Sequence, residues 1–367
     1  MMPARPASSA PALWIRLDPH PAAAGGSATA DVHAAECAPA WDPTTGRAAL
    51  HRVFGCRWLW WAPDPLRAWA CVLQALGVGD GRRVVAPVGI EPAIAATVRG
   101  RGAVLVEVDL DRHTGFPRWE AAPDPGAVAR DAVYLVEHRH GRPCPFPARA
   151  RAALVIEHAI DGLGGAIGGR PIGALGAAMI CALGRAPFAR AHGALIGTDD
   201  PSHVERLAAR AMPLEAGAGP SGALWRDAAG VEDWLAGCRA AAQVYSSVWR
   251  GADVPVRPLE PAPGTETSWS VYAVSVPDPD ALGRVLEDHG VETRRPVPAG
   301  LTGRRTAEPN AYPGAAAFYR HVMQVPNHPE LELDDILYVA GILGARLRAP
   351  EVCAQRRDAL QEPGTSH

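Results

Sequence analysis

Short, uninterrupted runs of apolar residues alternate along the chain with segments of helical periodicity. The helical pattern is clearest in 66–77, which closes at Gly77, and in 90–102. Continuous apolar strands separated by helices predict a mainly parallel sheet that is covered on both faces. The expected strands are the runs at 83–87, 103–109, 131–138, 152–158, 177–183 and 193–198.

A second pattern begins after a helical stretch at 203–250 and a proline-rich linker at 257–268. Residues 269–294 predict a strand, a Pro/Asp turn, a helix and a second strand, and 331–347 predict a closing helix. We therefore expect a large α/β domain at 46–250 and a small C-terminal α+β domain at 251–348. An Ala/Pro/Ser/Gly-rich leader at 1–45 and a tail at 349–367 flank them.

Composition narrows the class of protein. The chain has 367 residues, 48% of them hydrophobic, and a formal net charge of −3 with acids and bases interspersed. Without a basic stripe, nucleic acid is not an expected partner, and no apolar run approaches the ~20 residues of a membrane span. We expect a cytoplasmic globular protein.

Cysteine and lysine usage restrict the chemistry further. The seven cysteines are odd in number and lack CxxC spacing, which predicts neither a disulfide framework nor a zinc site. All 36 residues in the Lys+Arg count are arginine. No side chain can therefore form a Schiff base with a carbonyl compound by the usual lysine route.

Ionisable residues collect where the predicted strands end. Because ligand groups gather at the carboxyl ends of parallel strands, this edge is the candidate site. The side chains expected there are Glu91, His138, His140, His158 and Asp161.

The segments around this edge resemble the DegT/StrS-type nucleotide-sugar aminotransferases, which are fold-type-I pyridoxal-phosphate (PLP) enzymes. The resemblance spans about residues 50–345 and includes "VEHRHGRPCPF", "VIEHAIDGLGGAIGGRPIGALG" and "VMQVPNHPELELDDI". It implies a PLP-transferase-like α/β fold, a large domain with a mainly parallel central sheet plus the small domain, and a homodimer.

Several positions depart from the family's catalytic pattern. The Ser-Gly-Thr turn that cradles phosphate falls at Asp64-Pro65-Leu66, and the aromatic residue over the pyridine ring falls at Glu91. The aspartate that pairs with the pyridine nitrogen falls at His158, and the Schiff-base lysine falls at Gly184 or Arg185. Because arginine stays protonated, it cannot act as an amine nucleophile. From these departures we expect that PLP is lost and that the chain uses no cofactor.

The altered pocket has two interpretations. In the first, the chain is a PLP-independent biosynthetic enzyme of specialised metabolism that dehydrates, isomerises, cyclises or condenses a small polar intermediate. His158 is then the general acid/base, Glu91 or Asp161 its orienting carboxylate, and Arg185 an anion clamp. The substrate would also meet His138, His140 and His192.

In the second interpretation, the chain is a non-catalytic pseudo-aminotransferase. It would then pair with an active paralogue as a heterodimer, or bind a small molecule without converting it.

Each candidate residue also has a structural alternative. His158 could form a hydrogen bond with the end of a neighbouring strand, and Asp161 could cap the glycine-rich turn. Glu91 could interact favourably with the dipole of the helix that it precedes. Arg185 could pair with any carboxylate of its loop. A metal held by the histidines and acids of this edge is chemically possible, but no spacing demands one, so we predict no metal site.

Overall fold

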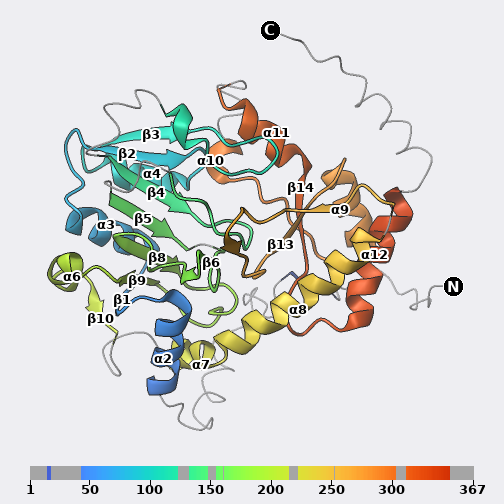
Figure 1. Cartoon of the computed structure of the whole chain (residues 1–367), viewed down its shortest axis with the longest axis horizontal. Helices are drawn as coiled ribbons and strands as arrows, with labels where there is room; N and C mark the ends of the chain where they lie inside the picture. Colours follow the sequence, from blue (N-terminus) through green and yellow to red (C-terminus); the bar gives the residue numbers. More distant parts are fainter. Residues whose placement is uncertain are drawn as a thin grey trace, which may run out of the picture.

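The computed structural model describes residues 15–17, 43–122, 132–147, 154–159, 161–214, 222–251, 253–302 and 311–347. Its centre is an eight-stranded sheet in the order β10-β1-β9-β8-β5-β4-β2-β3 (Figure 1). The strands are β1 Trp58–Ala62, β2 Arg83–Pro87, β3 Val104–Val108, β4 Val133–Glu137, β5 Leu154–His158, β8 Ala178–Ala182, β9 Ala194–Thr198 and β10 Met212–Pro213.

Five neighbouring strands, from β3 to β8, run parallel, and β9 turns the direction because it pairs antiparallel with both β8 and β1. The sheet is therefore mainly parallel, and the predicted α/β fold class is confirmed. In β1 the tryptophans alternate between the faces, since Trp60 packs into the core on one face of the sheet and Trp61 into the core on the other.

Helices cover the sheet on both faces. Helices α3 (Pro65–Ala75), α4 (Pro92–Arg99) and α6 (Pro201–Ala208) contribute side chains to one core. Helices α2 (Pro43–Phe54) and α7 (Gly222–Ala229) contribute to the core on the opposite face. A short 3-10 turn, η1 (Trp119–Ala121), and the segment around Phe146 pack over the outer strands.

The C-terminal part has its own antiparallel sheet in the order β11-β13-β14, formed by Arg257–Pro258, Tyr272–Ser275 and Val322–Val325. Helices α9 (Pro279–Asp288) and α12 (Leu333–Leu347) pack against it. Helices α10 (Ala299–Thr302) and α11 (Pro313–His321) lie between this part and the large sheet.

The second strand expected before residue 294 does not form. Val291 and Arg294 each make only one isolated bridge, to Ile15 and to Gln324. The later run β14 takes the place beside β13 along its whole length. The second strand of this unit was therefore expected at the wrong place, because the strand that pairs with β13 comes about thirty residues later, after α10 and α11.

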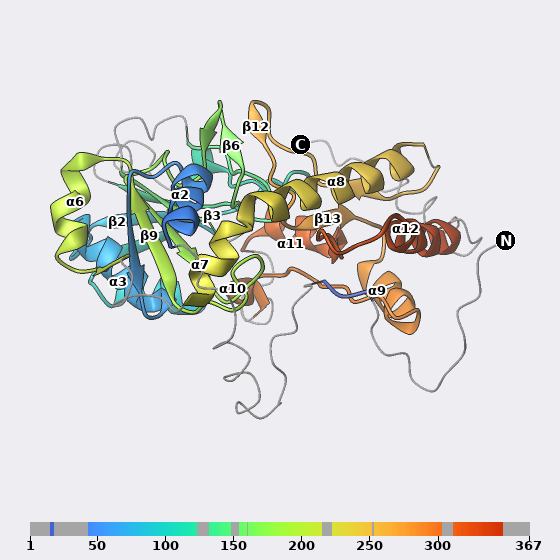
Figure 2. The same ribbon diagram turned by 90° about the horizontal axis from the view of Figure 1, so that it is seen from below.

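Helix α8 (Val231–Arg250) connects the two parts (Figure 2). Its first turns place Val231 and Leu235 in the core of the large part, whereas Tyr245 and Trp249 lie in the core of the C-terminal part. A small sheet also joins segments from both sides, because β12 (Thr265–Glu266) pairs with β6 (Ala166–Ile167), which pairs with β7 (Arg170–Pro171). The predicted boundary at 250 therefore stays a prediction.

Three residues of the expected leader pack onto the C-terminal part. Ile15 is buried and exchanges backbone hydrogen bonds with the chain around Val291, and the backbone nitrogen of Leu17 donates to Glu292 at 3.2 Å. The start of α2 also falls inside the predicted leader. The tail at 349–367 lies outside the described residues.

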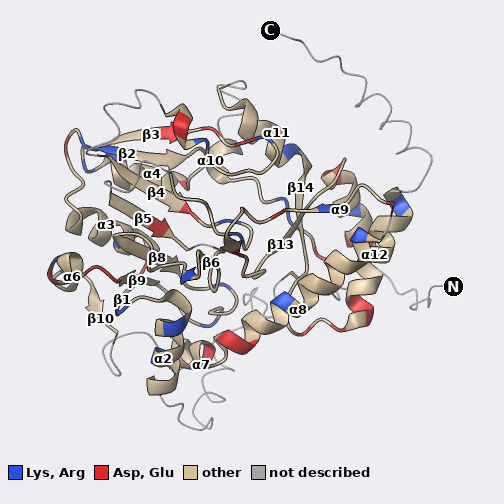
Figure 3. Ribbon diagram, in the orientation of Figure 1, with Lys and Arg blue, Asp and Glu red and all other residues tan. Residues whose placement is uncertain are grey.

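Charged residues of both signs are interspersed over the molecule (Figure 3). Of the helices described, none combines the length and the apolar composition needed to cross a membrane.

Candidate functional site

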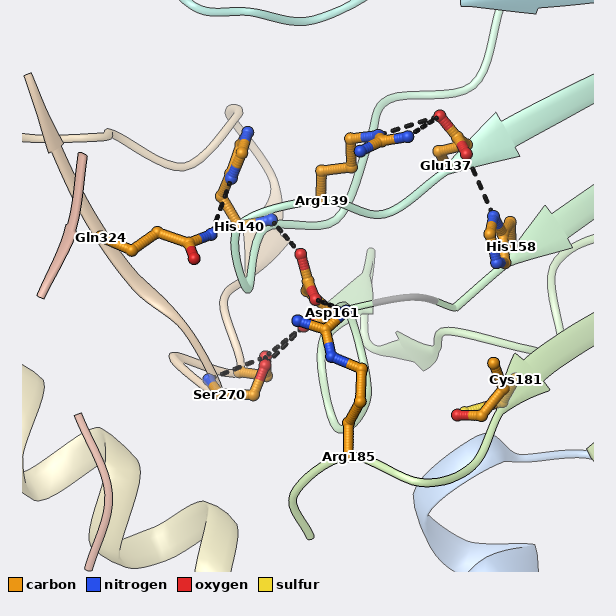
Figure 4. A network of polar contacts seen from close by, with 11 residues as sticks. Glu137, Arg139, His140, His158, Asp161, Cys181, Arg185, Ser270 and Gln324 are labelled. Carbon is orange, nitrogen blue, oxygen red and sulfur yellow. Dashed lines mark hydrogen bonds and ion pairs between the residues drawn. The ribbon is translucent and has the colours of Figure 1, made fainter. Parts of the chain in front are cut away.

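The site is built where two parallel strands end side by side. Strands β4 and β5 are in register so that Glu137 stands directly opposite His158. The His158 Nδ1 atom lies 3.1 Å from Glu137 Oε1, and both side chains are buried (Figure 4). The edge of the His158 ring meets the ring of Trp69 from α3, with 5.2 Å between ring centroids.

This geometry fixes which imidazole nitrogen carries the proton. A carboxylate oxygen only accepts, so Nδ1 of His158 is the donor to Glu137. The Nε2 atom of His158 has no hydrogen-bond partner within the described part of the chain. A neutral His158 therefore keeps its lone pair on Nε2, which is the arrangement of a general base that a carboxylate orients.

Glu137 is shared between two cationic or polar partners. Its Oε2 accepts from Nε of Arg139 at 2.9 Å, while Oε1 faces His158. Burial alone would raise the pKa of Glu137, but Arg139 and His158 together hold its pKa below the ordinary value. Glu137 therefore stays ionised at neutral pH.

Asp161 organises the loop that follows β5. Its Oδ2 accepts from the backbone nitrogen of His140 at 3.1 Å, and its Oδ1 lies 3.4 Å from Arg185. Its carbonyl oxygen accepts from the hydroxyl of Ser270 in the C-terminal part. Asp161 and Arg185 are thus brought together as an ion pair, but neither contacts the imidazole of His158 in the structure (Figure 4).

The remaining predicted residues have other surroundings. The carboxylate on His158 is Glu137 rather than Glu91, which lies exposed before α4 and makes no capping hydrogen bond. His192 is exposed, and its ring packs against Trp61. Neither Glu91 nor His192 contacts His158 among the described contacts.

His138 belongs to the buried scaffold below the loop. Its Nδ1 accepts from the backbone nitrogen of Cys144 at 3.0 Å, so its Nε2 donates to Glu157 at 3.2 Å. Glu157 also accepts from three backbone nitrogens of the turn at 173–176. Both side chains are fully buried, which makes this pair a support for the strand ends.

His140 lies on the other side of the Glu137–Arg139 pair. It has a left-handed backbone with φ of 60° and is buried against Phe318 and Tyr319 of α11. Burial, followed by Arg142 and Arg139, lowers the pKa of His140 well below its ordinary value. His140 is therefore neutral and does not form an ion pair with Glu137.

The residues Glu137, Arg139 and Trp69 were not predicted as site residues. The signal for Glu137 was present, since "VYLVEH" and "LVIEH" are two parallel strands that both end in an acid and a histidine. Their pairing register is what places the acid of one strand opposite the histidine of the other.

Two small cavities border the site. One, of about 40 Å³, is lined by Asp161, Arg185, Ser270 and Asn327 among others. The other, of about 20 Å³, is lined by residues around Glu137, Arg139 and His140. Among the described residues, no group of three or more His, Cys, Asp or Glu side chains is arranged to hold a metal ion.

The N-terminus of α3 differs from a phosphate cradle. Asp64 is its N-cap and accepts from the backbone nitrogen of Arg67 at 2.8 Å, and Pro65 removes one donor. The carboxylate thus occupies the first turn, where an anionic ligand would otherwise bind. Because the chain has no lysine, it also has no side chain for an imine with an aldehyde.

Comparison with known proteins confirms the resemblance. Residues 67–215 match the model of the DegT/DnrJ/EryC1/StrS aminotransferase family. The erythromycin biosynthesis sensory transduction protein EryC1 of Saccharopolyspora erythraea is 27% identical over 302 residues, which cover 74% of this chain and 81% of that protein.

Solved structures support the fold. The aminotransferase TlmJ of Streptoalloteichus hindustanus superimposes with a TM-score of 0.69 at 20% identity, covering 91% of this chain and 98% of TlmJ. A GDP-4-keto-6-deoxymannose-3-dehydratase with a trapped PLP–glutamate geminal diamine gives a TM-score of 0.67 at 15% identity, covering 85% and 95% of the two chains.

These findings correct the expectation that the chain uses no cofactor. That expectation is wrong, because the matching family consists of aminotransferases and a structural relative carries PLP, so the comparisons point to PLP. The residues present do not fit the covalent form of that cofactor, since the chain has no lysine, and Arg185, one of the two residues expected at the lysine position, forms an ion pair with Asp161. The substitutions at the site concern the manner of attachment and do not by themselves indicate loss of the cofactor.

Proposed function

We propose, on the premise that this chain is a relative of the DegT/DnrJ/EryC1/StrS aminotransferase family, that it is a biosynthetic enzyme of specialised metabolism. Its substrate would be a small polar intermediate of the sugar class, and its chemistry would be proton transfer by His158. The supporting observation is the Glu137–His158 pair, which leaves Nε2 of a buried histidine as the base. When PLP is bound, it supplies an electron-withdrawing ring; the chain itself offers no lysine for an imine.

The proposed roles follow the contacts. His158 takes a proton from a carbon next to a ketone and returns it to the same or a neighbouring atom, while Glu137 stabilises the imidazolium that forms. Arg185 is proposed to orient the substrate's polar groups at the mouth of the larger cavity. We further propose a cytoplasmic homodimer.

The experiment measures proton exchange directly. The full-length protein is incubated in D2O with GDP-4-keto-6-deoxymannose, which the name of the structural relative identifies as that relative's substrate. We expect NMR to show deuterium entering at the carbons beside the ketone. His158→Gln should slow this exchange about 100-fold or more, because general base catalysis contributes on that scale.

The control variant is His289→Gln, because His289 lies exposed after α9 and its ring bonds only to its own helix. It should exchange at the wild-type rate. Exchange by the wild type no faster than in protein-free buffer, or equal rates for His158→Gln and wild type, would contradict the proposed catalytic role.

One observation favours a second candidate function, a non-catalytic partner of an active paralogue. His158 is only 4% exposed and lines neither of the two cavities that border the site. Co-expression with a lysine-bearing family member tests this candidate. Stable co-elution, with activity that survives His158→Gln and Arg185→Gln in this chain, would support it, whereas separate elution would contradict it.

A further inference from the structure

The smaller cavity beside the site contains two buried nitrogen atoms without hydrogen-bond partners. It lies between the end of β4, the turn around Gly115 and helix α11. Nε of Arg142 and Nε2 of His140 each lack a partner among the described residues, and the two side chains are 2% and 4% exposed. Both residues line this cavity.

The cation of Arg142 is buried and makes no ion pair with any carboxylate of the described residues. Its two terminal nitrogens donate to the carbonyl oxygens of Glu260 and Thr114, each at 2.9 Å. Its guanidinium lies 4.6 Å from the ring centroid of Phe116. Burying a charge without an opposite charge is costly, and burial lowers the pKa of Arg142 to about 10. An anion in contact with this group would offset that cost.

The other charged residues that line the cavity do not pair with this cation. Glu137 and Arg139 both line the cavity, but they are paired with each other at 2.8 Å and cancel. The Nδ1 atom of His140 lies 3.5 Å from the amide nitrogen of Gln324, and a neutral imidazole that accepts this hydrogen bond carries its proton on Nε2. Both unpartnered nitrogens are therefore donors that need an acceptor.

We propose that this cavity is a binding site for one small monovalent anion of halide size, held by the Nε–H of Arg142 and the Nε2–H of His140. The volume of about 20 Å³ is sufficient for one small guest. Chloride is the obvious occupant. This anion site is independent of the proposed reaction, because anion binding requires no chemical step at His158.

A stability titration of the full-length protein tests the proposal in solution. Thermal unfolding is followed in increasing sodium chloride or sodium bromide, with sodium gluconate keeping the ionic strength constant. A ligand that binds the folded state alone raises the melting temperature and the effect saturates, so we expect a rise of about 2 °C or more. Identical melting temperatures in all three salts would overturn the proposal.

Variants locate the effect. Arg142→Met removes the charge and the Nε–H but keeps the aliphatic stem, and it should abolish the halide-dependent rise. If this variant does not fold, His140→Asn decides, since asparagine tolerates the left-handed backbone but is too short to reach the same position. Arg57→Gln is the matched control, because Arg57 is 67% exposed and distant from the cavity in the fold. A rise that persists in both site variants would overturn the proposal.

Crystals grown in bromide identify the occupant. An anomalous peak between Arg142 Nε and His140 Nε2, present in the wild type and absent from the variants, is the expected result. An ordered water at that position without anomalous signal would overturn the proposal, because a neutral guest would then satisfy both donors.

Discussion

Glu137 connects a histidine and an arginine that come from two strand ends. One carboxylate oxygen of Glu137 accepts from Arg139 and the other faces His158, so the shared carboxylate positions both side chains. Breaking one partner of a buried charged pair is more costly than any single contact suggests, because the charge that remains is left in a poorly solvating environment. Glu137 is therefore the residue on which the local electrostatics depend most.

We expect Glu137→Gln to lower the free energy of unfolding by about 3 kcal/mol near neutral pH. The folded state depresses the pKa of Glu137, so its contribution is present above the unfolded pKa and is lost as pH falls through the lower folded pKa. The difference between wild type and variant should shrink near pH 3, as measured by urea unfolding at both pH values. Glu330→Gln, at an exposed position, is the control, and an equal loss at both pH values would contradict the assignment.

At this scale the sequence identified one half of the central pair. His158 was placed correctly at the end of β5, but its carboxylate was sought at Glu91 and Asp161. A strand pattern shows which residues end a strand, but the partner of a side chain depends on the register between strands, which local sequence does not contain. Asp161 instead meets Arg185, through a loop conformation that no residue pattern specified.

Helix α3 shows how one element combines folding and site formation. Asp64 caps its N-terminus, Pro65 occupies its first turn, and Trp69 extends from its buried face onto His158. The carboxylate cap stabilises the helix dipole and satisfies a backbone donor. The N-terminus of α3 is therefore capped by its own residues at the position where members of the matching family are expected to bind phosphate.

We expect Asp64→Ala to lower the free energy of unfolding by about 1 kcal/mol, which is the usual cost of losing an N-cap. Asp278→Ala is the matched comparison, because Asp278 caps α9 and accepts from the backbone nitrogen of Ala281 at 2.9 Å. Chemical denaturation of the three proteins would measure both losses. A negligible change for Asp64→Ala beside a normal loss for Asp278→Ala would show that the α3 cap does not contribute.

Element positions were largely predictable, whereas one pairing was not. Six strands of the large sheet (β2, β3, β4, β5, β8 and β9) and helices α3 and α4 follow from apolar runs and glycine stops, whereas β1 and β10 were not among the expected strands. In the C-terminal part, residues 291–294 were expected to form the second strand, but the later segment β14 pairs with β13. Which of two segments pairs with a strand is a tertiary effect.

For the whole molecule, the absence of lysine constrains how the family's cofactor can be held. We expect that PLP mixed with the full-length protein and reduced with borohydride leaves no pyridoxyl group on any internal residue, because the chain has no side-chain primary amine. Mass spectrometry of the peptides measures this directly, and a lysine-bearing family member treated in the same way is the control. An internal pyridoxyl adduct would contradict the argument, whereas PLP removable by dialysis would agree with it.

The overall architecture followed from the sequence more completely than the chemistry did. Alternating strands and helices gave the fold, and motif order gave the resemblance to the family, because both are properties of long segments. The expected loss of cofactor was wrong because it extended single substitutions to the entire binding function. A site depends on a few atoms, and relatives can hold the same group with different contacts.

Helix α8 is packed at one end into the core of the large part and at the other end into the core of the C-terminal part. Because the helix contributes side chains to both cores, melting it removes apolar cover from both. The two halves of the molecule are therefore coupled in their loss of structure, so that damage deep in one half also shortens the lifetime of the other.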